Sequence, residues 1–299
     1  GGNLVRACSV FVLFIASFTY VTAQINATGT IASRALGIPF EAGVWVGLIS
    51  ILICSMLGGM RAVTWTQVAQ YIVLIVAYLI PVFWISSKVG GGVFPHLMLG
   101  DEVARLGELE QQFGLVKNSA ADMKAAGVPG GLKYISGTHS GVPEGGMAVW
   151  KYLSLAICMM VGTASLPHIL MRYFTTPSVR AARKSVAWSL FFIFLLYSSA
   201  PMLATLSKLA LMDPNLPTGI IGKSISDVQS IEWVQRWSEV KQVFIADFNG
   251  DGILQLNEWF MRGDVVVLAT PEVAGLPFVI SGLVFAGGMA AAMSTADGL

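Results

Sequence analysis

The chain has 299 residues, of which 55% are hydrophobic and only 12% are charged, with a formal net charge of +1. Soluble domains carry charge on roughly a quarter of their residues, so this composition excludes an ordinary soluble domain and predicts an all-α polytopic membrane protein embedded in a lipid bilayer. A net charge this close to zero gives no reason to expect a nucleic-acid partner. The three cysteines lie inside apolar runs and show neither disulfide nor metal-ligand spacing.

Six apolar stretches are candidates to cross the roughly 30 Å of hydrocarbon in a bilayer, which takes roughly 20 helical residues. They cover 4–24, 43–58, 62–86, 147–174, 184–211 and 274–299, the second being the shortest. Basic residues in short loops resist translocation, so Arg6, Arg61 and the basic stretch 172–184 are expected in the cytoplasm. The segments 25–42, 87–146 and 212–273 are then expected outside. Because the chain starts at Gly1 and stops at Leu299 inside an apolar run, we expect it to be an internal piece of a longer protein.

The outer segment 212–273 is acidic and contains a calcium-loop pattern. The stretch ADFNGDGILQLNEW, 246–259, matches that pattern at each ligand position. Oxygens at these spacings complete a Ca²⁺ shell, while Gly252 makes the sharp turn. The expected ligands are Asp247, Asn249, Asp251, the backbone carbonyl of Ile253, Gln255 near a water, and Glu258. We expect an entering helix upstream and an exiting helix from near Leu256; the alternative is a polar turn between two short helices.

The outer segment 87–146 is less informative. A short helical pattern occurs within 90–114, and the turn-rich stretch 127–146 is expected to be irregular.

The fourth apolar stretch contains small residues and a proline near its middle, GTASLPH, 162–168. Pro167 lacks an N–H and frees a carbonyl in the preceding turn. A spanning helix broken near its midpoint is typical of a transporter site, where unwound backbone coordinates an ion or solute. An ordinary proline kink is the alternative.

The last stretch ends GGMAAAMSTADGL, 287–299. Ala291, Ser294 and Thr295 follow i, i+3, i+4 spacing, which places one backbone carbonyl and two hydroxyls on one helix face. Close helix packing also favours small residues. Packing does not require Asp297, an uncompensated acid in an apolar helix.

The stretches GGMRAVTWTQVAQ, VGTASLPHILMRYFTTPSVRAARKSV and AAMSTADG together resemble the sodium:solute symporter family, and the second is similar above all to the bacterial cation/acetate symporter branch. The likeness extends over nearly the whole chain. It implies part of an inverted-repeat, leucine-transporter-type helix bundle in a bacterial inner (plasma) membrane. The topology expected from the basic loops then places the calcium loop on the periplasmic side.

This resemblance also implies the site residues. Ala291, Ser294 and Thr295 match the family's sodium site. Asp297 is hypothesised to be a further cation ligand or proton acceptor paired with Gln67, because many members have Asp where this chain has Gln67. The alternative is that Asp297 lies near the cytoplasmic end of the helix and is hydrated. The broken stretch is implied to line the substrate path. Its expected lining residues are Gly162, Thr163, Ala164, Ser165 and His168.

The implied function is sodium- or proton-coupled symport of a small organic solute, with a monocarboxylate such as acetate the best inference; proline, a sugar or another organic anion is the alternative. A membrane sensory module of a symporter-like histidine kinase is the second class of function. An enzyme is not expected, since the sequence contains no nucleophile elbow, metal-binding His/Glu pair or P-loop. The calcium loop is not a general feature of the family.

Overall fold

The computed structural model describes residues 2–89, 95–114, 120–129, 133–134, 148–166, 170 and 174–298. The chain divides into two compact units, which are described separately. The first unit consists of Gly1–Pro81, Glu232–Lys241 and Leu268–Leu299, and the second consists of Val82–Ile231 and Gln242–Val267.

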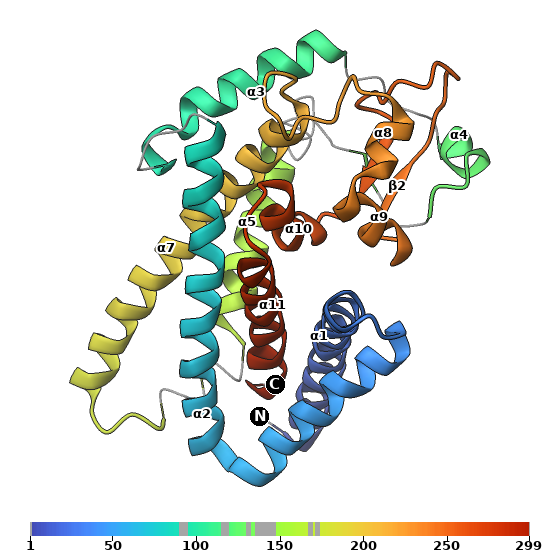
Figure 1. The fold of residues 1–299 in the computed structure, drawn as a ribbon. Helices are drawn as coiled ribbons and strands as arrows, with labels where there is room; N and C mark the ends of the chain where they lie inside the picture. Colours follow the sequence, from blue (N-terminus) through green and yellow to red (C-terminus); the bar gives the residue numbers. More distant parts are fainter. Residues whose placement is uncertain are drawn as a thin grey trace. The chain divides into compact units, whose positions relative to one another are not determined.

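Long apolar helices dominate the structure (Figure 1). Within the described residues, 4 helices are long and apolar enough to cross a membrane: α1 (Asn3–Leu36), the part Ala62–Val89 of α2 (Phe40–Val89), α7 (Val179–Met212) and α11 (Phe278–Gly298). Shorter apolar helices cover Phe40–Ile53 at the start of α2 and Val149–Ala164 within α5 (Ala148–Ala164). These stretches coincide with the predicted spans and confirm an all-α, multi-pass membrane architecture.

The prediction that residues 25–42 form a loop is wrong for most of this stretch. Helix α1 continues to Leu36, ends at Gly37 with φ 65°, and α2 begins at Phe40. The polar residues of this stretch stay helical because small residues let the two helices pack closely: a Cβ built on Gly47 would lie 2.1 Å from Cγ2 of Thr28. Thr28 is fully buried at this crossing. Only 37–39 therefore connect α1 to α2.

Helix α2 is interrupted at Gly59, whose φ of 56° and ψ of −175° are not helical. Glycine adopts such angles without the steric cost that a Cβ brings. The break separates the second predicted span from the third, and Figure 1 shows the bend in this part of α2. The turn predicted from GGMRA is therefore at the expected position.

Helix α11 packs against α1 and against the second half of α2 within the first unit. A Cβ built on Gly287 would come within 2.6 Å of the Ala77 Cβ. This close approach holds the C-terminal part of α11 beside Gln67, so the residues of the predicted cation site lie next to a polar group of α2.

In the second unit, α3 (Leu99–Phe113) packs against α7. Arg105 of α3 donates to the carbonyl of Val89 at 2.9 Å and pairs with Asp213, the C-cap residue of α7. His96, in the short 3-10 helix η1 (Pro95–Leu97), lies 2.9 Å from the Ser199 hydroxyl. The helical pattern predicted within 90–114 is thus confirmed as α3.

The two predicted outer segments join in one small antiparallel sheet of order β1-β3-β2. Strand β1 (Lys133–Tyr134) comes from 87–146, while β2 (Val243–Ile245) and β3 (Trp259–Met261) come from 212–273. Lys133 and Val243 both pair with Met261. The expectation of irregular structure throughout 127–146 is therefore wrong at β1. The remaining short helices of these segments are α4 (Ala120–Ala125), α8 (Ile225–Ser230), α9 (Glu232–Glu239) and α10 (Val265–Val273).

Candidate functional site

The predicted sodium ligands lie on one face of α11. The Thr295 hydroxyl donates to the carbonyl oxygen of Ala291 at 3.0 Å, so two of the proposed ligand atoms are already neighbours. A hydroxyl has two lone pairs beyond the proton that it donates, and a carbonyl oxygen accepts more than one partner, so both oxygens can still coordinate a cation. Ser294 lies on the adjacent turn, where its own carbonyl accepts a hydrogen bond from Gln67 Nε2 at 2.7 Å.

Asp297 is buried, with 7% of its surface exposed, and neither carboxylate oxygen has a hydrogen-bond partner among the described residues. Gln70 of α2 lies close enough to interact with this carboxylate. The buried Oε1 of Gln70 also lacks a donor within the described part of the chain. Buried oxygens of this kind are unfavourable unless a partner such as the Gln70 amide, a cation or a proton satisfies them.

Sequence reasoning identified Gln67 and missed Gln70. The structure brings Gln67 to Ser294 and Gln70 to Asp297, so both glutamines of TQVAQ face α11. Their i, i+3 spacing puts them on the same helix face. A second amide three residues after the first, in an otherwise apolar helix, was the signal that could have indicated this pair.

The predicted solute-lining stretch coincides with the end of α5. The helix stops at Ala164, and the backbone N–H of Ser165 bonds to the carbonyls of Val161 and Gly162. The Thr163 hydroxyl donates back to the carbonyl of Met159 at 2.7 Å. Helix α5 therefore ends before Pro167, and whether the chain is broken or only kinked at this proline stays a prediction. His168 and Pro167 lie outside the described residues, and α5 belongs to the second unit.

The predicted calcium loop is flanked by strands, so the expected entering and exiting helices are wrong. Strand β2 ends at Ile245 immediately before the loop, and β3 starts at Trp259 immediately after it. The upstream apolar pattern does form a helix, α9, but it ends at Glu239. Trp259 and Phe260 are fully buried in this unit, and aromatic residues suit a pleated strand, which explains why the chain does not continue as a helix.

Inside the loop the acidic side chains hold backbone N–H groups. Asp247 accepts from Gly250 at 2.7 Å and from Gly252 at 3.1 Å, while Asp251 accepts from Ile253 at 2.8 Å. The Ile253 N–H holds the pKa of the Asp251 carboxyl below its ordinary value of 3.8. Asp251 is therefore ionised at neutral pH.

Glu258 is fully buried and closes the loop from its last position. Its two carboxylate oxygens accept from the backbone N–H groups of Phe248 and Gln255, each at 2.9 Å. No group of three or more His, Cys, Asp or Glu side chains is placed to hold a metal anywhere in the described residues. The predicted calcium ligands therefore all belong to this loop. In this conformation their carboxylates accept hydrogen bonds from backbone N–H groups and are not gathered around a common metal position.

A largely buried ion pair lies near the C-terminal end of α1, and sequence reasoning missed it. Nη2 of Arg34 lies 2.7 Å from Oε1 of Glu272, and Trp237 Nε1 donates to Oε2 of the same carboxylate at 2.7 Å. The Arg34 guanidinium also lies over the Trp237 ring, 5.1 Å from its centroid. All three residues belong to the first unit. Their charges are far apart in sequence, so no spacing pattern could indicate the pair.

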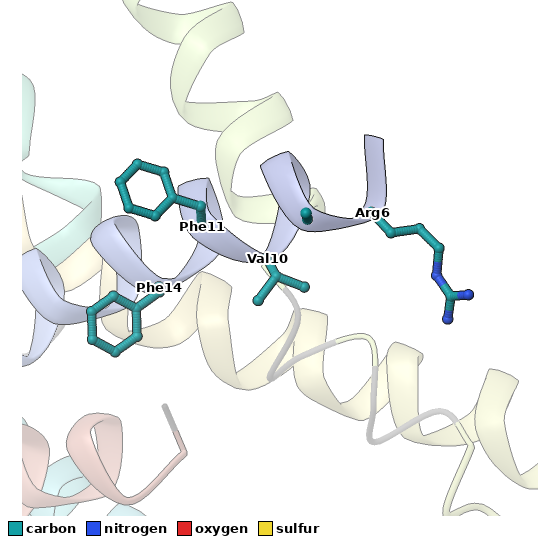
Figure 2. Close-up of a pocket in the computed structure, with 5 residues that line it drawn as sticks. Arg6, Val10, Phe11 and Phe14 are labelled. Carbon is teal, nitrogen blue, oxygen red and sulfur yellow. The ribbon is translucent and has the colours of Figure 1, made fainter. Parts of the chain in front are cut away.

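Two hollows lie on the surface of the first unit. One, of about 260 Å³, lies beside Arg34 and Glu272. The other, of about 500 Å³, is lined by five residues of α1 alone, and Figure 2 shows Arg6, Val10, Phe11 and Phe14 around it. Because one helix supplies every lining residue, the second hollow is an open helix face and not an enclosed binding site.

Comparison with known proteins supports the family resemblance. The model of the sodium:solute symporter family matches residues 1–224. An uncharacterized symporter of Cupriavidus necator is 38% identical over 375 residues, which cover 100% of this chain and 54% of that protein. The monocarboxylic acid transporter of Corynebacterium glutamicum is 30% identical, covering 60% of this chain and 30% of the relative. The uncharacterized symporter YwcA of Bacillus subtilis is 26% identical, over a match that covers 60% of this chain and 29% of that protein.

The chain thus spans about half the length of the first of these relatives and less than a third of the other two. No solved structure matches the chain.

Proposed function

Because the chain belongs to the sodium:solute symporter family, we propose that the protein containing it is a secondary active transporter that moves a small organic solute together with a cation. The observation that carries this proposal is the buried Asp297 carboxylate, whose oxygens lack partners among the described residues. An isolated ionised carboxylate at such a position costs several kcal/mol, so intramembrane acids of this kind mark ion or proton paths.

The proposed cation site combines two sets of oxygens on α11. The first set is the Ala291 carbonyl with the Ser294 and Thr295 hydroxyls. The second set is the Asp297 carboxylate with Oε1 of Gln70. Sodium is a hard cation and is expected to prefer oxygen ligands of this kind, while a carboxylate without donors can instead take up a proton. Sodium is the proposed coupling ion, as the family name implies, and proton uptake by Asp297 is the alternative outcome of the test below.

The proposed solute is a small monocarboxylate such as acetate. One observation supports it: a relative is named as a monocarboxylic acid transporter. The proposed lining residues are Gly162, Thr163, Ala164, Ser165 and His168.

The test is uptake into proteoliposomes that contain the intact protein, with sodium and proton gradients imposed separately. Acetate, lactate, pyruvate and proline are offered in turn. Asp297→Asn is expected to abolish cation-driven uptake while leaving expression and membrane insertion unchanged. Asp264→Asn, at an exposed acid of the outer segment, is the matched control and should behave as the parent protein.

Two outcomes of this test separate the alternatives. Loss of sodium-driven uptake assigns Asp297 to the sodium site, whereas loss of proton-driven uptake alone assigns it to proton transfer. Unchanged cation dependence in Asp297→Asn contradicts the proposed site.

We also propose that the loop 247–258 binds calcium on the periplasmic side of a bacterial inner membrane. The donor set fits, because Asp247, Asp251 and Glu258 each have acceptor sites beyond the N–H groups they already bind. Asn249, Gln255 and the Ile253 carbonyl supply the other oxygens. Binding requires the carboxylates to move toward one another from their present hydrogen-bonded positions. A single calcium loop without a partner loop is expected to bind calcium weakly, with a Kd of about 0.1 mM. At about 1 mM calcium, such binding would stabilise the folded loop by about 1.4 kcal/mol.

A further inference from the structure

The N-terminal part of α7 is exposed along its whole length. None of residues 179–198 is buried, and every buried residue of α7 lies between Ser199 and Met212. At 1.5 Å per residue, these 20 residues extend for about 30 Å. Within the described part of the chain, this stretch of α7 is therefore open to lipid and solvent.

Three cations lie in the first two turns of this helix. Arg180, Arg183 and Lys184 are exposed, and none of them forms an ion pair with another described residue. The sequence contains no acid between Glu144 and Asp213. Like charges at i, i+3 and i, i+4 spacing repel each other, and cations near a helix N-terminus also add to the positive end of the helix dipole. The uncompensated charge therefore favours an anionic partner.

The same helix face continues into an aromatic cluster. Trp188 follows Lys184 by four residues, so these two side chains are neighbours on the helix surface. The Trp188 ring stacks on Phe192 and meets Phe191 edge to face, with 6.1 Å between the ring centroids in each pair. Trp188 and Phe191 are each 55% exposed. The cluster therefore presents an apolar surface directly beyond the cations.

The distance between the two groups matches the depth of a lipid headgroup. From Lys184 to Trp188 the helix rises by about 6 Å. The polar headgroup layer on each side of a bilayer is roughly 5 to 7 Å thick. Tryptophan is enriched at the edge of the hydrocarbon. With Trp188 at that depth, the cations lie at the level of the lipid phosphates and Phe191 at the level of the acyl chains.

We propose that this face of α7 binds an anionic phospholipid, whose phosphate contacts Arg180, Arg183 and Lys184 and whose acyl chain contacts Trp188 and the adjoining phenylalanines. Arginine and phosphate form charge-assisted, two-point hydrogen bonds, which are among the stronger ones in proteins. A small soluble anion would leave the aromatic surface uncovered, so the face fits a lipid better. The bound lipid supports the part of α7 that no described residue buries. This inference does not depend on the proposed transport function.

The test measures lipid binding to the intact, purified protein by native mass spectrometry. Phosphatidylglycerol and phosphatidylcholine with the same acyl chains are added in turn, and the parent protein should bind the first more tightly because only that lipid carries a net charge. Arg180→Gln with Lys184→Gln should weaken phosphatidylglycerol binding by about 25-fold, since each cation near an anionic lipid surface contributes about fivefold. Binding of phosphatidylcholine should not change.

Two further double variants are the controls. Arg180→Lys with Lys184→Arg keeps both charges and should retain phosphatidylglycerol binding. Arg6→Gln with Lys151→Gln removes the same net charge from two exposed cations that are far apart in the sequence and form no ion pair with another described residue. This variant should bind phosphatidylglycerol as the parent protein does. Inorganic phosphate should displace the lipid no better than sodium chloride of the same ionic strength.

If the Arg180→Gln, Lys184→Gln protein fails to fold, fluorescence quenching of Trp188 decides the question. The emission of Trp188 is the difference between the parent protein and Trp188→Phe in nanodiscs, and brominated phosphatidylglycerol should quench it more than the same amount of brominated phosphatidylcholine. Equal quenching, equal affinity for the two lipids, or normal phosphatidylglycerol binding in a folded double variant overturns the proposal. Specific displacement by inorganic phosphate also overturns it, because the site then takes a soluble anion.

Discussion

The ion pair between Arg34 and Glu272 is expected to be the most costly one to break among the ion pairs described in the first unit. Their side chains are 9% and 14% exposed, so neither charge regains full hydration when its partner is removed. Removing one partner of a buried pair costs about 3 to 5 kcal/mol, because it leaves an uncompensated charge. Glu272→Leu also removes the acceptor of the Trp237 N–H and should lie at the upper end of that range. Arg34→Met leaves Glu272 bonded to Trp237 and should lie at the lower end.

The double variant distinguishes charge compensation from packing. Arg34→Met with Glu272→Leu leaves no orphaned charge, so its cost should fall short of the sum of the two single costs by about 3 kcal/mol. Steric-trap unfolding of the intact protein in bicelles measures these free energies. The exposed i, i+4 pair of Arg236 and Glu232 is the matched control, and Glu232→Gln should cost only about 0.3 to 0.5 kcal/mol. Single costs that add to within about 0.5 kcal/mol would refute the reasoning.

Three further predictions concern the outer segments. Glu258→Gln removes the proposed bidentate ligand and should abolish calcium protection of the loop against limited proteolysis; if calcium does not protect even the parent protein, the loop is only a turn. A cysteine at Lys223 should react with an impermeant thiol reagent from the periplasmic side and one at Ser178 should not, and the opposite labelling would overturn the orientation. Burial raises the pKa of the Glu102 carboxyl above its ordinary 4.5, so its ionised form destabilises the fold at neutral pH. Glu102→Gln should therefore raise the Tm at pH 7, and the gain should vanish as the pH falls through the raised pKa toward 4.5; a gain that persists at acid pH contradicts this cause.

The membrane helices could be predicted because length and apolarity alone decide which stretches can cross a bilayer. The interruption at Gly59 and the stop of α5 at Ala164 also followed from local chemistry, namely paired glycines and a proline. The boundary between α1 and α2 could not be predicted in this way. Polar residues after Gln24 suggested a loop, whereas the contact of Thr28 with Gly47 keeps them helical. That contact depends on the tertiary packing of two helices and leaves no local signal.

Candidate-site prediction had the same strengths and limits. Spacing within one helix placed Ala291 and Thr295 together, and the structure has their oxygens 3.0 Å apart. The calcium pattern located an acidic loop, but it implied helices where β2 and β3 lie, and calcium binding itself stays a prediction. Gln70 and Arg34 acquire their roles from partners on other elements. The i, i+3 spacing from Gln67 could have indicated Gln70, but no spacing pattern indicates the pairing of Arg34 with Glu272, because only the fold brings these two residues together.

Strand β1 has a consequence for the order in which the protein assembles. Its partner β3 follows α5 and α7 in the chain, so Lys133 and Tyr134 emerge from the ribosome long before Phe260 and Met261 are synthesised. Until then β1 has no sheet to join, and closing so long a loop is slow. The sheet can therefore form only after α5 and α7 have been synthesised, and β1 stays unpaired until β3 follows them.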